Sequence, residues 1–344
     1  MEPRQDLTGM EKDELVALME EVKEQPFRGE QVFQWVQGRG QSSLEEMYNL
    51  PQNLREKLAT RVFIAPLKLV REWEGQGGTR KFLFELFDGE KIESVLLKHP
   101  DHYTLCISTQ VGCRFNCLFC ATGKMGLKRN LMAGEITGQV LEIVSRRGVN
   151  LRNIVFMGMG EPLDNLEAVL KAIALLGHPQ GQNIGQRRIT ISTCGLIPEI
   201  NQLAALQLQC VLAISLHAPS DDLRSKLVPI NRRYPLEDLL QACRNYFTTS
   251  GRRISFEYAL IEGINDTPDH AHHLAALLSK FPAHINLLPA NQIQHANFKG
   301  AGEESLKRFW SILEASGLPV TVRKPRGQDI QAACGQLNPL EGEV

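Results

Sequence analysis

The chain has 344 residues, of which 43% are hydrophobic and 22% are charged, and its formal net charge is -1. This composition excludes a mostly disordered chain, and the near-zero charge requires that any bound nucleic acid be held by local basic patches. No apolar run reaches the roughly 18 residues of a membrane span, and the N-terminus has no apolar signal region, so we expect a cytoplasmic protein that does not contact a membrane.

The first 68 residues are expected to form a small helical accessory domain. Helical periodicity runs over Lys12–Val22, Gln31–Val36 and Leu54–Val62. This segment is also acidic, with 11 acidic and 5 basic side chains in residues 1–50, whereas the rest of the chain is mildly basic.

Residues 69–98 are expected to form a β-hairpin that links this domain to the core. The apolar runs KFLFELF and KIESVLL flank Asp88 and Gly89, a pair typical of hairpin turns. We expect a core over residues 99–337 and a short tail over 338–344.

Strand-length apolar runs alternate with amphipathic helices throughout the core. The predicted strands are Leu105–Ser108, Ile154–Met157, Ile189–Ser192, Leu212–Leu216, Ile254–Leu260 and Ile285–Leu288. The helices between and after them are Glu135–Arg146, Leu166–Leu176, Pro198–Leu208, Leu236–Tyr246, His270–Leu278 and Glu304–Ala315, followed by a short strand at Val320–Arg323. This alternation is typical of βαβ units. Six units are too few for an eight-fold barrel, so we predict an α/β fold, a partial six-unit parallel β/α barrel with its functional loops at the C-terminal ends of the strands.

A cysteine motif follows the first predicted strand. Cys113, Cys117 and Cys120 have the spacing CxxxCxxC, and three thiolates on one loop can bind a single metal centre. Eight cysteines in a chain without an export signal favour metal or thiol chemistry over a disulfide framework. The motif suits a 4Fe–4S cluster with one iron open to a substrate; a zinc site with a remote fourth ligand, or three unrelated buried cysteines, are the alternatives.

Small polar residues recur at the ends of the later strands. The second predicted strand ends in MGMGEPLDN, whose glycines let the backbone approach a ligand and whose Glu161 offers a carboxylate to an ammonium group. Each such residue alone is more often a strand-end cap, but together they predict a ligand site at this end of the barrel.

Glu93 lies on the predicted hairpin. Strand alternation puts it on one face with Val95 and Leu97. An isolated carboxylate on an apolar face should have a raised pKa, which suits a general base; an exposed edge-strand glutamate is the alternative.

The cysteine motif, with Phe119 before its last cysteine, resembles that of the radical S-adenosylmethionine (SAM) enzymes. The resemblance narrows to the RlmN/Cfr family of RNA adenine methyltransferases over nearly the whole chain. The stretches that carry it are GCRFNCLFCATGKMGLKRNL, MGMGEPLDNL, ITISTCG, AISLHAP and RGQDIQAACGQL.

This resemblance implies a role for each matching residue. Cys113, Cys117 and Cys120 would bind one 4Fe–4S cluster. The residues that would contact SAM are Gly160, Glu161, Ser192, Ser215, Leu216, His217 and Asn286. Cys334 would carry the methyl group, Cys106 would release it through a transient disulfide with Cys334, and Glu93 would accept a proton. For both cysteines, a packing role in the protein interior is the alternative.

The resemblance also implies a reaction with two SAM molecules per turnover. One would methylate Cys334, and the other would yield a 5′-deoxyadenosyl radical that activates this methyl group for addition to carbon 2 of adenine. The expected substrates are 23S rRNA, in the peptidyl transferase centre, and tRNA, next to the anticodon. The expected partner is a reducing protein such as flavodoxin, and the enzyme is expected to be a monomer.

Two other functions compete with this interpretation. One is methylation of carbon 8 of the same adenine, the activity of the sibling branch of the family; Pro162 after Gly160 and Glu161 favours the carbon-2 branch. The other is a non-catalytic RNA-binding protein stabilised by a metal.

Overall fold

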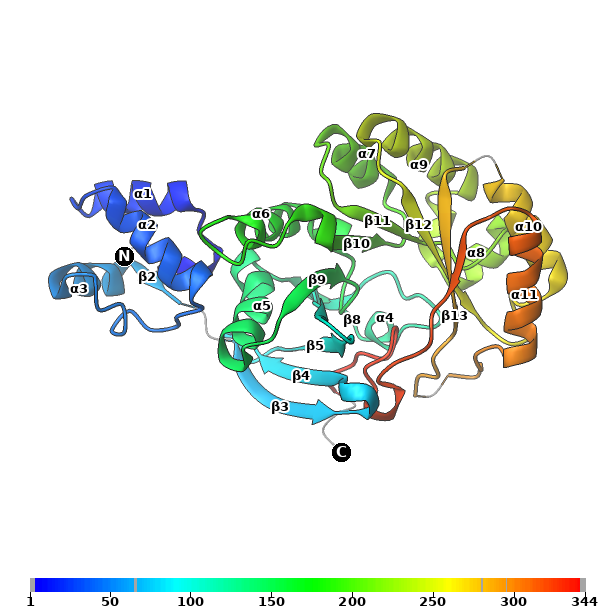
Figure 1. Cartoon of the computed structure of the whole chain (residues 1–344), viewed down its shortest axis with the longest axis horizontal. Helices are drawn as coiled ribbons and strands as arrows, with labels where there is room; N and C mark the ends of the chain where they lie inside the picture. Colours follow the sequence, from blue (N-terminus) through cyan, green and yellow to red (C-terminus); the bar gives the residue numbers. More distant parts are fainter. Residues whose placement is uncertain (1–3, 65–66, 280, 295, 341–344) are drawn as a thin grey trace.

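A curved mixed sheet forms the centre of the computed structural model, which describes residues 4–64, 67–279, 281–294 and 296–340 (Figure 1). Within these residues the strand order is β14 (Val320–Val322), β13 (Ala283–Pro289), β12 (Ile254–Leu260), β11 (Val211–Ser215), β10 (Ile189–Thr193), β9 (Leu151–Phe156), β6 (Tyr103–Cys106), β5 (Lys91–Lys98), β4 (Arg80–Glu85) and β3 (Lys68–Glu74). In this order, all neighbouring strands from β14 to β6 are parallel, and all neighbouring strands from β6 to β3 are antiparallel. Since β3 and β14 are separate edges, the sheet is open, and the predicted partial α/β barrel is confirmed.

Helices connect the parallel strands, as the alternation in the sequence predicts. They are α5 (Ala133–Arg147), α6 (Leu166–Gly177), α7 (Ile197–Ala205), α9 (Leu236–Ser250), α10 (Pro268–Leu278) and α11 (Glu303–Ala315). Figure 1 shows them on the outer side of the sheet. A further short helix, α8 (Asp221–Leu227), follows β11. Its sequence DDLRSKL has too few apolar residues for periodicity to reveal it.

The predicted hairpin is present, with Gly89 in the left-handed region at φ 83° between β4 and β5. Only glycine adopts this conformation readily, which is why the turn could be predicted. β3 precedes the hairpin, and β5 pairs with β6. Residues 69–98 therefore continue the sheet of the core, so that Glu93 shares one sheet with the first barrel strand.

The N-terminal helices α1 (Lys12–Glu21), α2 (Phe27–Phe33) and α3 (Gln52–Arg61) lie at one side of the barrel (Figure 1). A π-helical turn over Gln34–Gly38 continues α2, and β1 (Gln5–Asp6) pairs with β2 (Val62–Phe63). These elements share a hydrophobic core of their own, which Leu175 of α6 joins from the barrel.

Two short strands surround the cysteine motif. β7 (Gln110–Cys113) pairs with β8 (Gly126–Asn130), and α4 (Ala121–Lys124) lies between them. The prediction that the motif directly follows the first barrel strand is wrong, because that strand ends at Cys106 and β7 intervenes. The sequences QVGC and GLKRN are too short to show alternation.

The chain after β14 crosses the open side of the barrel. The Asp329 carboxylate accepts a hydrogen bond from the backbone N–H of Gln76, at 2.7 Å, and the Arg326 guanidinium donates to the carbonyl of Lys98, also at 2.7 Å. This segment thus joins the two edges of the sheet.

Candidate active site

The concave face of the sheet holds a cavity of about 660 Å³ that is lined by both Cys106 and Cys334. Cys106 lies on β6 opposite Val95 of β5, and both side chains face the cavity. Cys106 is half-buried, and it packs against the core of the barrel while it lines the cavity. Two cysteines that are 228 positions apart in the sequence therefore face one space.

Both thiols are protonated at neutral pH. Burial is the main cause of the raised pKa of Cys106, and the neighbouring Cys334 adds to it. Burial of its thiol in the cavity likewise raises the pKa of Cys334, although the residue as a whole is exposed. All eight cysteines of the chain are free thiols. A disulfide between these two is therefore absent here, although they lie in the same cavity.

Gly335 explains how Cys334 reaches the cysteine motif. Its φ is 84°, and a Cβ there would lie 2.5 Å from the Phe119 carbonyl oxygen. The Gly335 carbonyl accepts a hydrogen bond from the Ala121 N–H, at 2.7 Å, and the Asn291 amide donates to the Cys334 carbonyl, at 3.0 Å. Cys334 is thus held between the cavity and the cysteine loop.

The three cysteines of the motif lie close enough to influence one another. Burial raises the pKa of Cys113 to about 12 and that of Cys117 well above its usual range, and the charges of the neighbouring thiols add to both shifts. Cys120 also has a pKa raised by burial. Three such thiols become thiolates only beside strong positive charge, which an iron–sulfur cluster provides.

No three His, Cys, Asp or Glu side chains in the described ranges are grouped as ligands of one metal ion. A 4Fe–4S cluster does not need such a group, because each cysteine binds a different iron atom. The half-buried cysteine loop, with three thiols on a short segment, therefore fits a cluster.

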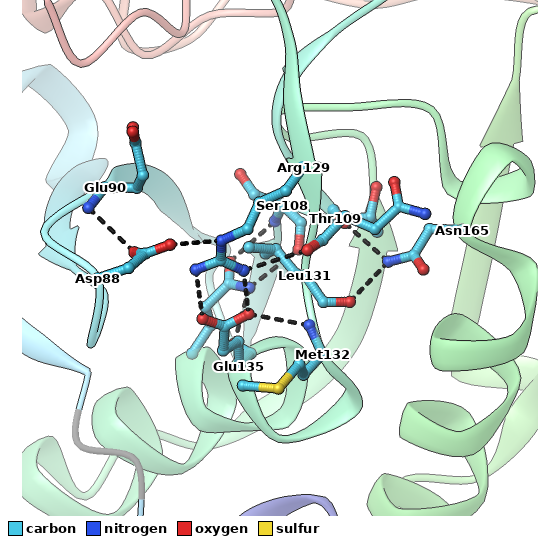
Figure 2. Close-up of polar contacts among 11 residues, drawn as sticks. Asp88, Glu90, Ser108, Thr109, Arg129, Leu131, Met132, Glu135 and Asn165 are labelled. Atoms are coloured by element: carbon cyan, nitrogen blue, oxygen red, sulfur yellow. Dashed lines mark hydrogen bonds and ion pairs between the residues drawn. The ribbon is translucent and has the colours of Figure 1, made fainter.

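Arg129 fixes the hairpin that carries this loop, as Figure 2 shows. Its guanidinium binds both carboxylate oxygens of Glu135 on α5, each at 2.8 Å, and the Asp88 carboxylate at the β4–β5 turn, at 2.6 Å. Glu135 also accepts the Met132 N–H at the start of α5. One side chain thus connects β8, the β4–β5 turn and α5.

The same hairpin carries a basic cluster whose side chains have partners within the protein. Lys128 pairs with Glu90, at 2.7 Å, and Lys124 donates to the Asn116 side chain. Arg129 thus has a structural role, whereas Lys124 and Lys128 remain exposed.

The residues that follow β9 make close contacts and hydrogen bonds within the protein. Gly160 has φ 99°, and a Cβ there would lie 2.6 Å from Cβ of Gln110, so this glycine allows a close approach within the protein. The buried Glu161 carboxylate accepts the N–H groups of Cys194, at 2.8 Å, and Leu163, at 3.1 Å. Burial raises its pKa. Glu161 therefore ties the end of β9 to the end of β10.

His217 lies just beyond β11 with φ 58°. Its Nδ1 accepts the Ala259 N–H, at 2.9 Å, and its ring packs edge-on against Phe119 with centroids 4.5 Å apart. Burial, with a smaller effect of the Arg224 charge, lowers its pKa to about 3, so the imidazole is neutral. His217, which the sequence analysis selected, thus lies beside the cysteine loop.

Sequence reasoning missed Arg224, a fully buried residue of α8. Its guanidinium donates to the carbonyls of Cys194, Ser215 and Leu216, at 2.7 to 3.2 Å, and to the Asn231 side chain, at 2.9 Å. It thereby fixes the ends of β10 and β11. A single arginine in a polar heptapeptide gives no sequence signal of this role.

Asn286 and Ser192 lie within their strands. The Asn286 amide donates to the Glu257 carboxylate, at 2.7 Å, and to the Ser255 hydroxyl, at 2.8 Å, so it belongs to a network inside the sheet. Ser192 is half-buried on β10. Asn291, which the sequence analysis did not select, lies beyond the end of β13 and lines the cavity.

Glu93 is buried, and the prediction that its carboxylate is isolated is wrong. Lys81 on β4 forms an ion pair with it, at 2.9 Å, and both side chains are at most 3% exposed. Its other oxygen accepts the Asn338 N–H, at 2.9 Å. The pair was missed because Lys81 lies on a different strand, and register cannot be read from the pattern alone.

Two basic clusters border the cavity. One is Arg187 and Arg188 before β10, and the other is Arg323, Lys324 and Arg326 after β14. Arg187, Arg188 and Lys324 form no ion pair within the described residues. The cavity thus combines two thiols with a positively charged rim.

Comparison with known families agrees with this geometry. A model described as "Radical SAM superfamily" matches residues 107–275, and one described as "Ribosomal RNA large subunit methyltransferase N-terminal domain" matches residues 5–64. A protein of Desulforamulus reducens described as a probable dual-specificity RNA methyltransferase RlmN is 49% identical over 96% of this chain and 95% of its own. One of Bacillus subtilis with the same description is 44% identical over 98% and 94%.

A solved structure is similar over nearly its whole length. It is a radical SAM methyltransferase from Sphaerobacter thermophilus, 47% identical, with a TM-score of 0.94 over 97% of this chain and 99% of that one. No helix in the described part of our chain is long and apolar enough to cross a membrane.

Proposed function

The chain belongs to the RlmN family of radical SAM RNA methyltransferases, and on that premise we propose that it methylates carbon 2 of adenine in 23S rRNA and in tRNA through a methylated Cys334. The observation that carries this proposal is the shared cavity of Cys334 and Cys106. Carbon 2 of adenine is electrophilic, so a direct transfer of a methyl cation from SAM should fail. A thiol that first accepts the methyl group provides another route.

The cysteine loop is the cofactor site of this mechanism. A 4Fe–4S cluster on Cys113, Cys117 and Cys120 supplies, when bound, the electron that cleaves SAM into methionine and a 5′-deoxyadenosyl radical. Gly335 and Asn291 hold Cys334 against this loop. The methyl group on Cys334 would therefore be close to the place where the radical forms.

Glu93 and Cys106 complete the reaction in our proposal. Once the Cys334 methylene carbon is bonded to carbon 2 of adenine, Glu93 accepts the proton from carbon 2. Lys81 supports this role because its ammonium group lies 2.9 Å from the carboxylate and fixes its position. Cys106 then loses its proton and attacks the sulfur of Cys334, and the bond between sulfur and the methylene carbon breaks with its electron pair left on carbon. That carbon takes up a proton and becomes the methyl group, while the odd electron from the radical addition stays on the new disulfide, which the reducing partner's chemistry must then return to two thiols. Two SAM molecules per turnover follow from the separate needs for a methyl group and a radical.

The remaining assignments concern binding. Residues at the strand ends and two within strands are proposed to position SAM, with Asn291 as a further candidate: Gly160, Glu161, Ser192, Ser215, Leu216, His217 and Asn286. The two basic clusters at the rim suit RNA phosphates. Residues 1–68 would position the RNA, residues 69–98 and 99–337 would form the catalytic part, and a reducing protein such as flavodoxin would restore the active enzyme, which we propose to be a monomer.

A Cys106→Ala variant tests the two-thiol mechanism. It should still cleave SAM and attack the RNA but fail to release it, so protein and RNA should remain covalently joined through Cys334. A denaturing gel with labelled RNA detects this product. Cys334→Ala is the matched control, because it removes the attachment point and should give neither a cross-link nor methylated RNA.

The outcomes separate this proposal from its alternatives. Methylation at the wild-type rate without a cross-link in folded, cluster-loaded Cys106→Ala protein would refute the role of Cys106. Mass spectrometry of the RNA product distinguishes 2-methyladenosine from 8-methyladenosine, so the 8-methyl isomer would instead place the enzyme in the sibling branch.

A further inference from the structure

A second hollow, of about 350 Å³, lies beside the segment that carries Cys334 and is lined mainly by glutamines. Gln331 and Gln336 flank Cys334 in the sequence, Gln328 lies just before them, and Gln292 and Gln294 come from the loop after β13. The rest of the lining is apolar, and no charged side chain contributes. Nothing in the proposed mechanism uses this hollow.

Two of these glutamines hold the Cys334 segment in place. The Gln336 side chain accepts the Ala333 N–H, at 3.1 Å, and donates to the carbonyl of Gln292, at 2.8 Å. The Gln328 amide donates to the Asn291 side chain, at 2.8 Å. The hollow and the position of Cys334 therefore depend on one hydrogen-bond network.

The other three glutamines have side-chain amides with no partner in the described part of the chain. They are Gln292, Gln294 and Gln331. Gln292 and Gln294 are exposed, on either side of the buried Ile293. The hollow thus combines free donors and acceptors with an apolar surface.

This combination selects a nucleobase over a phosphate. A carboxamide presents a donor and an acceptor side by side, which matches the edge of a base. The apolar residues Ile293 and Ala296 can contact a base face. A phosphate needs positive charge, which this chain places at the rim of the other cavity, on the Arg187 and Arg323 clusters.

We propose that the glutamine-lined hollow binds one unpaired nucleobase of the RNA, next to the adenine that receives the methyl group. The inference rests on the proposed function, since it takes RNA as the substrate and Cys334 as the methyl carrier. Sequence-specific RNA recognition commonly uses unstacked bases that are read on their edges, and the site lies within a few residues of Cys334.

The test combines a protein variant with altered RNA. In Gln292→Ala/Gln294→Ala, two exposed side chains without protein partners are removed, so the fold should be retained. The RNA is a labelled hairpin with the target adenine in its loop, made with one flanking nucleotide at a time abasic. Fluorescence anisotropy with the full-length cluster-loaded protein measures binding, and mass spectrometry measures methyladenosine.

We expect one flanking position at which loss of the base weakens binding to the wild type by about 5- to 100-fold. The double variant should bind the intact hairpin more weakly by a similar factor and show no further loss with that abasic hairpin. Gln202→Ala, an exposed glutamine of α7, is the control and should bind every hairpin like the wild type.

The inference would be overturned if the double variant bound the intact hairpin like the wild type. It would also be overturned if, at every flanking position, the loss of affinity from the variant and the loss from the abasic nucleotide multiplied. The binding measurement needs no turnover. If the wild type cleaves SAM but methylates no RNA, the proposed function fails, and the binding result still decides whether the hollow recognises a base.

Discussion

The polar side chains that are buried at the end of the barrel form hydrogen bonds mainly with backbone groups. Within the described ranges, Arg224 donates to three backbone carbonyls and forms no ion pair, and Glu161 accepts two N–H groups and forms none. Each such group would be costly if unpaired. These residues therefore fix the loops around the cysteine motif, which a reaction that transfers a radical requires.

His217 gives a prediction about pH at this scale. Its pKa of about 3 lies below the value of about 6.5 for an unfolded chain, so the unfolded state binds a proton first as the pH falls. The contribution of the neutral His217 to the free energy of unfolding is therefore fully present above pH 6.5. It is lost progressively as the pH falls from 6.5 to about 3. From pH 7.5 to pH 4.5 the loss from this group should be about 2–3 kcal/mol.

The variant His217→Asn should reduce this pH dependence. An asparagine oxygen can accept the Ala259 N–H in place of Nδ1, and asparagine tolerates the positive φ at this position. Chemical denaturation of both proteins between pH 4.5 and 7.5 measures the difference. Parallel stability curves for the two proteins would show that His217 is not protonated on unfolding, contrary to this account.

The residues that could be predicted from the sequence are those that belong to a local motif. Cys113, Cys117 and Cys120 stand on one loop, and their spacing alone indicates a metal centre. Lys81 and Arg224 could not be found in this way, because their partners come from other elements of the fold. Their roles depend on register and burial, which a single sequence does not display.

At the scale of elements, the segment after β14 is fastened on both sides of Cys334 to the antiparallel strands. Lys81 donates to the carbonyl of Gln331, at 3.4 Å, and Glu93 accepts the N–H of Asn338. The buried ion pair of Lys81 and Glu93 therefore contacts the segment that carries Cys334.

The variant Lys81→Met should loosen this segment. Removal of one partner of a buried pair leaves the other charge uncompensated, at a cost of about 3–5 kcal/mol. Urea denaturation measures the loss, and hydrogen exchange should increase in residues 331–338. The double variant Lys81→Met/Glu93→Gln removes both charges and should recover much of the stability; a single variant that loses less than about 1 kcal/mol would contradict the argument.

The elements themselves could be predicted where the periodicity is long. β12 has the predicted bounds Ile254–Leu260, because all seven of its residues are buried and five of them are apolar. β7 and β8 were missed because four or five residues do not establish a pattern. The site depends on them, since they carry the cysteine loop.

At the scale of the whole molecule, the N-terminal module exposes the aromatic ring of Tyr48 beside the buried Trp35. Tyr48 is 76% exposed, and its ring packs edge-on against Trp35 with centroids 5.0 Å apart. The Arg39 guanidinium lies over the Trp35 ring, 4.1 Å from its centroid. No sequence periodicity indicates this grouping, because Tyr48 lies in a turn region outside the helices.

The exposed Tyr48 ring gives the last prediction, because an exposed aromatic ring next to arginine is typical of platforms on which unpaired bases stack. Tyr48→Ala should weaken RNA binding by about 5- to 100-fold, since the stacking of one base contributes about 1–3 kcal/mol. SAM cleavage without RNA should not change, because the barrel keeps every contact described around the cysteine loop. Anisotropy with labelled RNA measures the affinity.

The control is Leu206→Ala, which removes an apolar side chain that is 47% exposed beside α7 on the barrel. It should leave both RNA affinity and SAM cleavage unchanged. If Tyr48→Ala binds RNA as tightly as this control, the N-terminal helices do not present a stacking platform there. Equal losses of RNA affinity and SAM cleavage in Tyr48→Ala would instead mean that the module supports the fold of the barrel, through the shared core that Leu175 joins.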